Sequence, residues 1–245
     1  MSYSASFYAR TTDAAYRSAA AVVPIVAGAL RPASVLDVGT GGGAWLRAWA
    51  EAGVGDLCGV DIAAREDSGF AVAASRFVRM NLDQPFDLGR RFSLVQSLEV
   101  AEHLPPESAA DFVDSLCRHG EVVLFSAAPP GQGGTNHFNE QPYDYWRGLF
   151  AKHGYKPVDW LRRALSGRRD VAWWYRYNTL IYANDRAIRS FPAPLAAAVV
   201  SDTEKIEDVA TVPHRLRRTI LRSLPPWLID QLAAAVDRVA ARMQR

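Results

Sequence analysis

The sequence has only two cysteines and no long run of apolar residues. Cys58 and Cys117 are too few for a disulfide framework, and they form no zinc site without histidine or carboxylate ligands. A membrane-spanning helix needs about 18 consecutive apolar residues, so we expect none. The first residues are polar and aromatic and contain no cleavable apolar segment. We therefore expect no signal peptide and a cytoplasmic protein.

The composition is that of a globular protein. Of the 245 residues, 49% are hydrophobic and 22% are charged, which excludes disorder over most of the length. Residues 1–150 carry 11 Lys and Arg against 17 Asp and Glu, whereas residues 151–245 carry 17 against 9. The arginines of the basic part are scattered and lack the interleaved aromatic residues of a nucleic-acid motif. We interpret them as a solvated surface and expect no nucleic-acid partner.

Short apolar runs alternate with helical stretches along the chain. Helices are expected at residues 13–30, 44–52, 107–118, 143–153 and 226–245, and strands at residues 34–38, 57–61, 76–80, 92–97, 122–126, 155–161 and 171–183. Pro24 and Gly28 are expected to break or bend the first helix. This alternation is typical of βαβ units and predicts an α/β fold with a mostly parallel sheet.

A glycine-rich turn follows the first expected strand. It has the pattern D-x-G-x-G-x-G, formed by Asp37, Gly39, Gly41 and Gly43. Glycine allows a tight turn and lets a ligand approach the backbone. Dinucleotide sites use a related pattern, so the turn alone does not decide the ligand. About 20 residues further on, Asp61 ends the second strand, where a carboxylate can bind both ribose hydroxyls of a nucleoside.

Two more segments continue this pattern. Asn81 and Leu82 follow the third strand, where the amino group of an adenine is commonly bound. The segment S-L-E-V-A-E-H-L-P, residues 97–105, ends the fourth strand and contains Glu99. A nucleoside ligand along the carboxyl ends of these strands is therefore expected.

Together, the order and spacing of these motifs resemble class I S-adenosylmethionine-dependent methyltransferases. The resemblance implies a Rossmann-like sheet of seven strands in the order 3-2-1-4-5-7-6, with strand 7 antiparallel and helices on both sides. It also implies S-adenosylmethionine as the cofactor. The cofactor-binding residues that it implies are Asp37, Gly39, Gly41, Gly43, Asp61, Asn81, Leu82 and Glu99.

The chain resembles one bacterial subgroup of this family in particular. The shared motifs are P-G-Q-G-G-T-x-H-x-N-E-Q at residues 130–141 and W-W-Y-x-x-N at residues 173–178. The resemblance implies a cofactor-binding domain over residues 1–185, with an N-terminal helical lid, and a helical extension over residues 186–245. Asn81 stands where an acid is usual, and Ser201 where we expect a histidine in relatives. The adenine contact and the substrate class therefore stay open, as does the choice between monomer and homodimer.

The first functional hypothesis is methyl transfer to a small-molecule acceptor in bacterial biosynthesis, such as a sugar, polyketide or peptide-derived metabolite. A base is needed only where the acceptor must lose a proton. His137 is the first candidate, because it lies in a glycine-rich loop beyond the fifth strand. His103 is the second candidate, and each histidine could instead serve only as a backbone hydrogen-bonding residue.

Metal binding is an alternative role for His103 and His137. Glu99, Glu102 and His103, with the later His137, resemble a pattern that holds a divalent metal in small-RNA 2′-O-methyltransferases. The same E-x-x-E-H pattern occurs in metal-free members of the wider family. We therefore expect no metal site.

The second functional hypothesis is cyclisation of S-adenosylmethionine itself to azetidine-2-carboxylate and methylthioadenosine. Polar anchors such as Asn139 and Ser201, and an aromatic face such as Tyr175, would hold the reacting groups. Alternation along the last expected strand would place Tyr175 on the same face as Trp173 and Tyr177. A non-catalytic scaffold that only binds the cofactor is the third hypothesis.

Overall fold

The central feature of the fold is a seven-stranded sheet in the order β3-β2-β1-β4-β5-β7-β6. The computed structural model describes residues 5–62 and 77–224. The strands are β1 (Ser34–Val38), β2 (Asp56–Asp61), β3 (Phe77–Arg79), β4 (Leu94–Leu98), β5 (Val122–Ser126), β6 (Tyr155–Val158) and β7 (Leu180–Asn184). Strands β1 to β5 pair in parallel, and β7 is antiparallel to both β5 and β6. The predicted fold class and strand order are confirmed.

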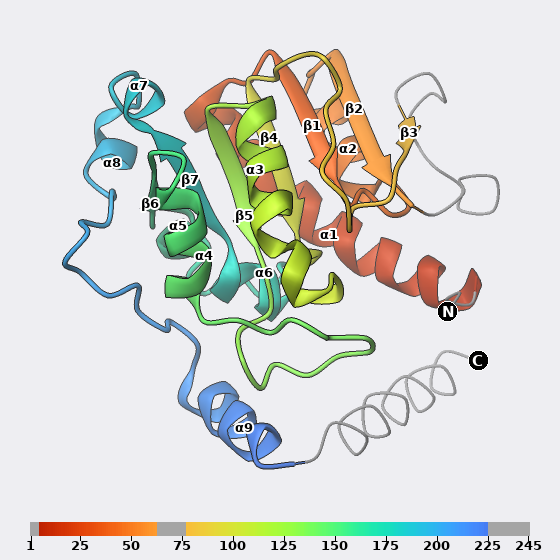
Figure 1. The fold of residues 1–245 in the computed structure, drawn as a ribbon, viewed down its shortest axis with the longest axis vertical. Helices are drawn as coiled ribbons and strands as arrows, with labels where there is room; N and C mark the ends of the chain where they lie inside the picture. Colours follow the sequence, from red (N-terminus) through yellow and green to blue (C-terminus); the bar gives the residue numbers. More distant parts are fainter. Residues whose placement is uncertain (1–4, 63–76, 225–245) are drawn as a thin grey trace.

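Helices cover both faces of this sheet (Figure 1). One face carries α1 (Ala5–Leu30) and α2 (Ala44–Glu51), and the other carries α3 (Ala109–His119) and α4 (Tyr143–Ala151). The remaining helical segments are η3 (Ala101–His103), η4 (Pro106–Ser108), α5 (Leu161–Ala164), α6 (Trp173–Asn178), α7 (Asp185–Ile188), α8 (Ala193–Ala196) and α9 (Val212–Arg222). Every residue of β1, β4 and β5 is buried, as expected for parallel strands covered on both faces. In the described part of the chain, none of the helices could span a bilayer.

Helix α1 differs from the prediction, because it begins at Ala5 and continues through Pro24. Proline removes one backbone hydrogen bond and usually kinks a helix interior. Here Val22, Val23 and Val26 are buried against α2 and the sheet. Apolar packing of this kind stabilises a helix more than local propensity does, and it offsets the cost of the proline.

The expected strand over residues 171–183 is wrong in its first half. Residues Trp173–Asn178 form α6, and only Leu180–Asn184 form a strand. On the helix, Trp173 and Tyr177 lie one turn apart with ring centroids separated by 6.4 Å, while Tyr175 points inward and is buried. The one-face arrangement of the three aromatic residues is therefore also wrong. Similarly, the expected strand over residues 155–161 ends at Val158.

The direction of β7 brings distant segments to the carboxyl edge of the parallel strands. Because β7 is antiparallel to β5, its first residue, Leu180, pairs with Phe125 near the end of β5. Helix α6, which precedes β7, therefore lies beside the loop of residues 127–142, which follows β5 (Figure 1). The strand order reverses between β1 and β4, and ligands of open α/β sheets bind outside the carboxyl ends at such a point.

Helix α9 lies against the same loop. Arg217 donates a hydrogen bond to the carbonyl of Gln132 (2.8 Å), and Arg222 donates one to the carbonyl of Pro130 (2.7 Å). The division of the chain near residue 185 stays a prediction. The helix expected at residues 226–245 lies outside the described residues.

Candidate functional site

The glycine turn joins β1 to α2 in a left-handed backbone conformation. Gly39, Gly41 and Gly43 have φ angles of 80°, 51° and 76°, which other residues rarely adopt. A Cβ atom on Gly39 would lie 2.4 Å from a methyl carbon of Val100, so the turn also needs glycine for close packing. In contrast, a Cβ atom on Gly41 would meet no atom within 4 Å. The turn therefore presents open backbone surface at Gly41.

Asp37 anchors the turn from within the sheet. Its carboxylate is buried and accepts hydrogen bonds from Thr40 Oγ1 (2.7 Å) and Gln96 Nε2 (2.9 Å). Burial raises the pKa of Asp37 to about 6, although these two hydrogen bonds oppose the shift. The side chain of Trp49 in turn donates to Gln96 (3.0 Å). Asp37 is thus fixed in place, and the fraction of its carboxyl group that is ionised changes with pH around 6.

Asp61 lies where β2 ends, close to the turn. Its Oδ2 atom accepts a hydrogen bond from the backbone N–H of Gly41 (2.8 Å). Beyond β3, Asn81 is exposed and caps its own turn by accepting from the N–H of Asp83 (3.1 Å), while Leu82 packs in the core. The structure thus brings Asp61 to the glycine turn, whereas the roles of Asn81 and Leu82 toward the cofactor stay predictions.

Glu99 lies directly after β4 and also has a left-handed backbone, with φ of 56°. Such a conformation costs a non-glycine residue roughly 1–3 kcal/mol and marks functional sites. The two carboxylate oxygens accept from Asn178 Nδ2 (3.1 Å) and Gln132 Nε2 (2.7 Å). Asn178 also donates to Gln132 Oε1 (2.8 Å) and accepts from the hydroxyl of Tyr143 (3.1 Å). This network joins β4, the loop of residues 127–142, α6 and α4.

Tyr175 packs against α2 at this edge of the sheet. Its ring meets that of Trp45 edge-on, with centroids 5.1 Å apart. Burial is the main cause that raises the pKa of Tyr175, and the nearby carboxylates of Glu99 and Asp37 add to the shift. A buried, neutral aromatic ring therefore lies next to α2, near the carboxylates of Glu99 and Asp37.

The loop of residues 127–142 is organised by Glu140. Its carboxylate accepts from the backbone N–H groups of Gly131 and Gly133 and from His137, each at 2.7–2.8 Å. Burial by itself would raise the pKa of Glu140, but these hydrogen bonds and the charge of His137 lower it overall. The carboxylate thus fixes both the path of the loop and the orientation of the imidazole.

His137, His103 and Glu102 lie together at this edge. The two imidazole rings are 4.9 Å apart, and His103 Nδ1 bonds to the carbonyl of Asn136 (3.1 Å). Burial and the charge of His137 lower the pKa of His103 to about 4, so His103 is neutral at pH 7. Glu102 is fully buried, and burial and the charge of Glu99 hold its pKa well above the ordinary value.

Asn139 and Ser201 do not join this group. Asn139 is buried and uses its amide to bond the carbonyl of Ala101 (3.3 Å) and the side chain of Gln141 (3.0 Å). Ser201 is exposed and pairs with Thr203 (3.3 Å) in its own turn. The contacts of Asn139 hold the loop in place, and those of Ser201 belong to the surface near α4.

Gln132, Asn178 and Glu140 belong to the motifs at residues 130–141 and 173–178, but the sequence alone indicated no role for them. Each is polar and part of a motif, which is a usable signal, because a buried polar side chain needs a partner. Their partners are 3–79 positions away in the sequence, and no common spacing reveals the pairs.

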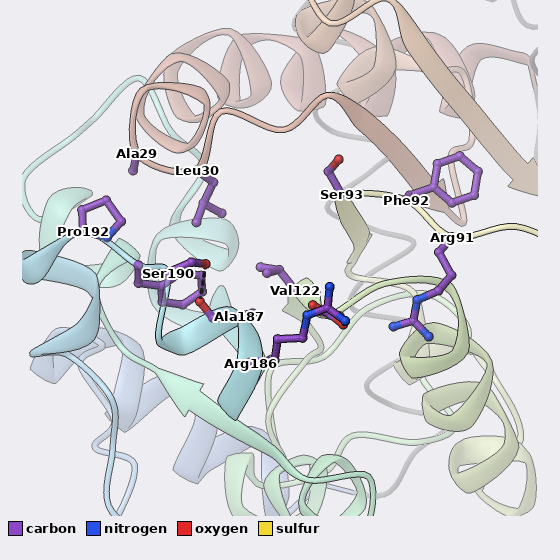
Figure 2. A pocket seen from close by; sticks show the side chains of 12 residues that line it. Ala29, Leu30, Arg91, Phe92, Ser93, Val122, Arg186, Ala187, Ser190 and Pro192 are labelled. Atoms are coloured by element: carbon purple, nitrogen blue, oxygen red, sulfur yellow. Dashed lines mark hydrogen bonds and ion pairs between the residues drawn. The ribbon is translucent and has the colours of Figure 1, made fainter.

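A separate pocket opens at the opposite edge of the sheet. It has a volume of about 620 Å³ and is lined by residues at the amino ends of β4 and β5, among them Ser93 and Val122 (Figure 2). Arg186 pairs there with Glu121 at 3.4 Å. Because ligands of this fold bind at the carboxyl ends of the strands, we do not place the cofactor in this pocket.

The strand order and the glycine turn define a Rossmann-like fold of the S-adenosylmethionine-dependent methyltransferase class. A family described as a methyltransferase domain matches residues 9–168, which is more than half of the sequence, and the chain belongs to this family. A comparison with curated proteins finds no significant match.

Several solved structures are similar in fold. Streptomyces venezuelae DesVI has a TM-score of 0.52 and 18% identity, covering 69% of this chain and 92% of that one. A sugar N-methyltransferase from Streptoalloteichus has a TM-score of 0.52 and 18% identity, covering 69% and 87%. The magnesium protoporphyrin IX methyltransferase of Synechocystis, with bound S-adenosylmethionine, has a TM-score of 0.50 and 20% identity, covering 75% and 85%. At these identities the likeness concerns the fold.

S-adenosylmethionine is the cofactor of the chain. The residues present fit it, because the open backbone at Gly41 lies next to the carboxylate of Asp61, which suits a ribose. The neutral ring of Tyr175 and the carboxylate of Glu99 suit the sulfonium end, since both surfaces favour a positive charge. These individual contacts are predictions that mutation can test.

Proposed function

We propose that the protein transfers the methyl group of S-adenosylmethionine to a hydroxyl of a small bacterial metabolite, such as a sugar, polyketide or peptide. The observation that carries this proposal is the pair of Glu140 and His137. The pair lies in the loop after β5, on the same edge of the sheet as the glycine turn. A carboxylate-oriented histidine at this place is suited to remove a proton from an acceptor.

The geometry of the pair determines which nitrogen acts. Glu140 Oε1 can only accept the hydrogen bond from His137 Nδ1 (2.8 Å), so Nδ1 carries the proton. Nε2 then has a free lone pair. The bound cofactor supplies a methyl group already activated on a sulfonium. Nε2 takes the acceptor proton as the acceptor oxygen bonds the methyl carbon and the carbon–sulfur bond breaks.

Positioning accounts for the rest of the rate. Asp61 and the glycine turn hold the nucleoside, and Glu99 with Tyr175 holds the sulfonium end. The network of Gln132 and Asn178 keeps Glu99 in its strained conformation. Because such positioning lowers the entropic part of the barrier, little further chemistry is required of the protein.

Cyclisation of the cofactor has less support. It needs a polar anchor that orients the cofactor amine, and the amide of Asn139 is already engaged with Ala101 and Gln141. Ser201 is exposed and bonds within its own turn. A non-catalytic scaffold has no need for the oriented pair of His137 and Glu140, so we do not favour that hypothesis either.

Product analysis tests the proposal. Purified protein is incubated with S-adenosylmethionine alone, and then with panels of hydroxyl-bearing sugars, polyketides and peptides, and the products are separated by mass. We expect no turnover without an acceptor and S-adenosylhomocysteine with a suitable one. Azetidine-2-carboxylate and methylthioadenosine formed from the cofactor alone would overturn methyl transfer.

A further inference from the structure

Glu102, His103 and His137, which we call the histidine cluster, come together from two loops at the carboxyl edge. Glu102 and His103 lie in η3, just after β4, and His137 lies in the loop after β5. One oxygen or nitrogen atom from each side chain lies within 4.8 Å of the other two. The parallel pairing of β4 with β5 brings the two loops together.

Both histidines use the same ring nitrogen, Nδ1, for a hydrogen bond within the protein. His103 Nδ1 faces the carbonyl oxygen of Asn136, and His137 Nδ1 faces the carboxylate of Glu140. Both partners are acceptors, so Nδ1 is the protonated nitrogen in the neutral form of each ring, and Nε2 is then the nitrogen that can bind a cation. An imidazole fixed in this way, by a carbonyl or a carboxylate behind it, is the usual arrangement of a metal-binding histidine.

The carboxylate of Glu102 lacks a counterpart among the described residues. The residue is fully buried, and neither carboxylate oxygen has a hydrogen-bond partner there. A buried carboxylate without a partner is costly, so such groups are usually paired or coordinate a cation. Two imidazole rings lie next to this carboxylate, so the ionised carboxylate and the two neutral rings would offer a cation three electron-pair donors.

The backbone holds the cluster in place independently of any ligand. The N–H groups of Phe138 and Asn139 both donate to the carbonyl of Glu102, at 2.8 and 3.0 Å. The ring of His137 lies so close to Gly134 that a Cβ atom there would be 2.2 Å from Nε2. The loop is therefore built around the present position of the imidazole.

We propose that the histidine cluster binds one divalent transition-metal cation through Glu102, His103 and His137. Two nitrogen ligands and one oxygen ligand favour Zn²⁺, Co²⁺ or Mn²⁺ over Mg²⁺ and Ca²⁺, which prefer all-oxygen sites. Ligand atoms lie about 2.0–2.2 Å from zinc, so the three side chains close in slightly around the ion. Glu99 is not part of this group of neighbouring ligand atoms, and each of its carboxylate oxygens already accepts a hydrogen bond, from Gln132 and Asn178.

Three protein ligands leave coordination positions for an oxygen of the acceptor. A cation there would lower the pKa of the bound hydroxyl, whose proton would pass to water, and the oxygen would then bond the methyl carbon as the carbon–sulfur bond breaks. The cation thus takes over the role that the metal-free protein gives to His137. This step rests on the proposed function, whereas binding of the cation does not.

Cation binding can be measured without any acceptor. Protein stripped with a chelator and dialysed is titrated with Co²⁺, and binding is followed by calorimetry and by the visible absorption of the ion. We expect about one equivalent per chain, competition by Zn²⁺, and no competition by a large excess of Mg²⁺. If neither Co²⁺ nor Zn²⁺ binds, the proposal is wrong, and the buried carboxyl of Glu102 is protonated rather than bound to a cation.

Variants separate this site from the cofactor site. Glu102→Gln and His137→Ala should each weaken Co²⁺ binding at least about tenfold, and Gly134→Ala should do so by displacing the ring of His137. His153→Ala removes a histidine outside the cluster and should leave Co²⁺ affinity unchanged. Asp61→Ala should weaken S-adenosylmethionine binding and leave Co²⁺ binding intact, which also shows that the protein is folded.

Cluster variants that bind Co²⁺ like the wild type would disprove the ligand assignment. Circular dichroism and cofactor affinity establish that each variant is folded. If the cation binds but no acceptor is methylated, the metal site stands and the proposed function fails. If methylation occurs in stripped protein that binds no cation, the proposed function stands and the metal site fails.

Discussion

The two halves of the carboxyl edge are built in different ways. The half at β1 and β2 is made of the glycine turn, Asp37 and Asp61, whose main contacts lie within the turn or connect neighbouring strands. The half at β4, β5 and β7 is made of long-range side-chain contacts, such as that between Glu99 and Asn178, which are 79 positions apart. The first half depends on backbone conformation, and the second depends on a network of polar side chains.

This difference suggests a division of labour. The backbone-dependent half suits a constant ligand, since its left-handed glycines and its carboxylate fit a nucleoside. The network-dependent half can change its side chains while the sheet stays the same, which suits a variable acceptor. Active-site loops on a rigid scaffold commonly have this property. The comparison predicts that mutations in one half leave the function of the other intact.

The largest effect is expected for His137→Ala. Loss of the group that activates the acceptor should lower turnover by about 10²–10⁴-fold and leave cofactor affinity within about twofold. Initial rates with saturating cofactor, together with calorimetry, measure both quantities. His153→Ala is the matched control and should keep full activity. An equal loss of cofactor affinity in His137→Ala would contradict the separation of the two halves.

Gly41→Val tests the half of the carboxyl edge at β1 and β2. A β-branched residue in the left-handed region is strained by about 1–2 kcal/mol, and its methyl groups fill the open space in front of the turn. We expect cofactor affinity to fall by at least about tenfold, as seen by calorimetry. Gly148→Ala, in the helix α4, has open space and no left-handed backbone, and should bind the cofactor normally. Normal binding by Gly41→Val would place the cofactor elsewhere.

Asn178→Ala tests the network. The change removes the donor to Glu99 and the acceptor for the hydroxyl of Tyr143, and leaves buried polar groups without partners. The free energy of unfolding should fall by about 1–3 kcal/mol, measured by urea denaturation. Asn81→Ala, at an exposed turn, serves as the control and should have a smaller effect. Equal losses of unfolding free energy in the two variants would show that the network does not stabilise the fold.

The last prediction concerns pH and Asp37, whose effect is confined to a narrow pH range. Its pKa is raised from 3.8 to about 6 in the folded protein, mainly by burial. The stabilisation from its bound proton is complete below pH 4 and is lost as the pH rises through about 6, a change of roughly 1–3 kcal/mol. The difference in unfolding free energy between the cofactor-free wild type and Asp37→Asn should therefore change over this window. A constant difference between pH 4 and 7 would show that Asp37 is not protonated on folding.

Local sequence signals predicted the first half well. The D-x-G-x-G-x-G pattern requires left-handed glycines, and the structure has them at Gly39, Gly41 and Gly43. The strands β1 and β5 have the predicted bounds, because continuous apolar runs in a buried parallel sheet leave little freedom. The site of Asp61 followed from the end of its strand.

The second half could be predicted only in outline. The aromatic run at residues 173–177 suits a strand by propensity, yet it forms α6, because the helix buries Tyr175 and brings Asn178 to Glu99. Propensity is weak where tertiary packing decides. Asn139 looked like a free polar anchor, but the fold uses its amide to fix the loop.

The sequence by itself determined the strand-and-helix alternation and the glycine turn, since each depends on steric rules that act within a few residues. The resemblance of its motifs to a known family implied the cofactor. Only the tertiary structure decided which polar side chains meet at the other half of the edge. Strand pairing brings η3 against the loop after β5, and so Glu102 and His103 reach His137 from 33 or more positions away. Contacts of this kind depend on the whole sheet being assembled, and no local pattern encodes them.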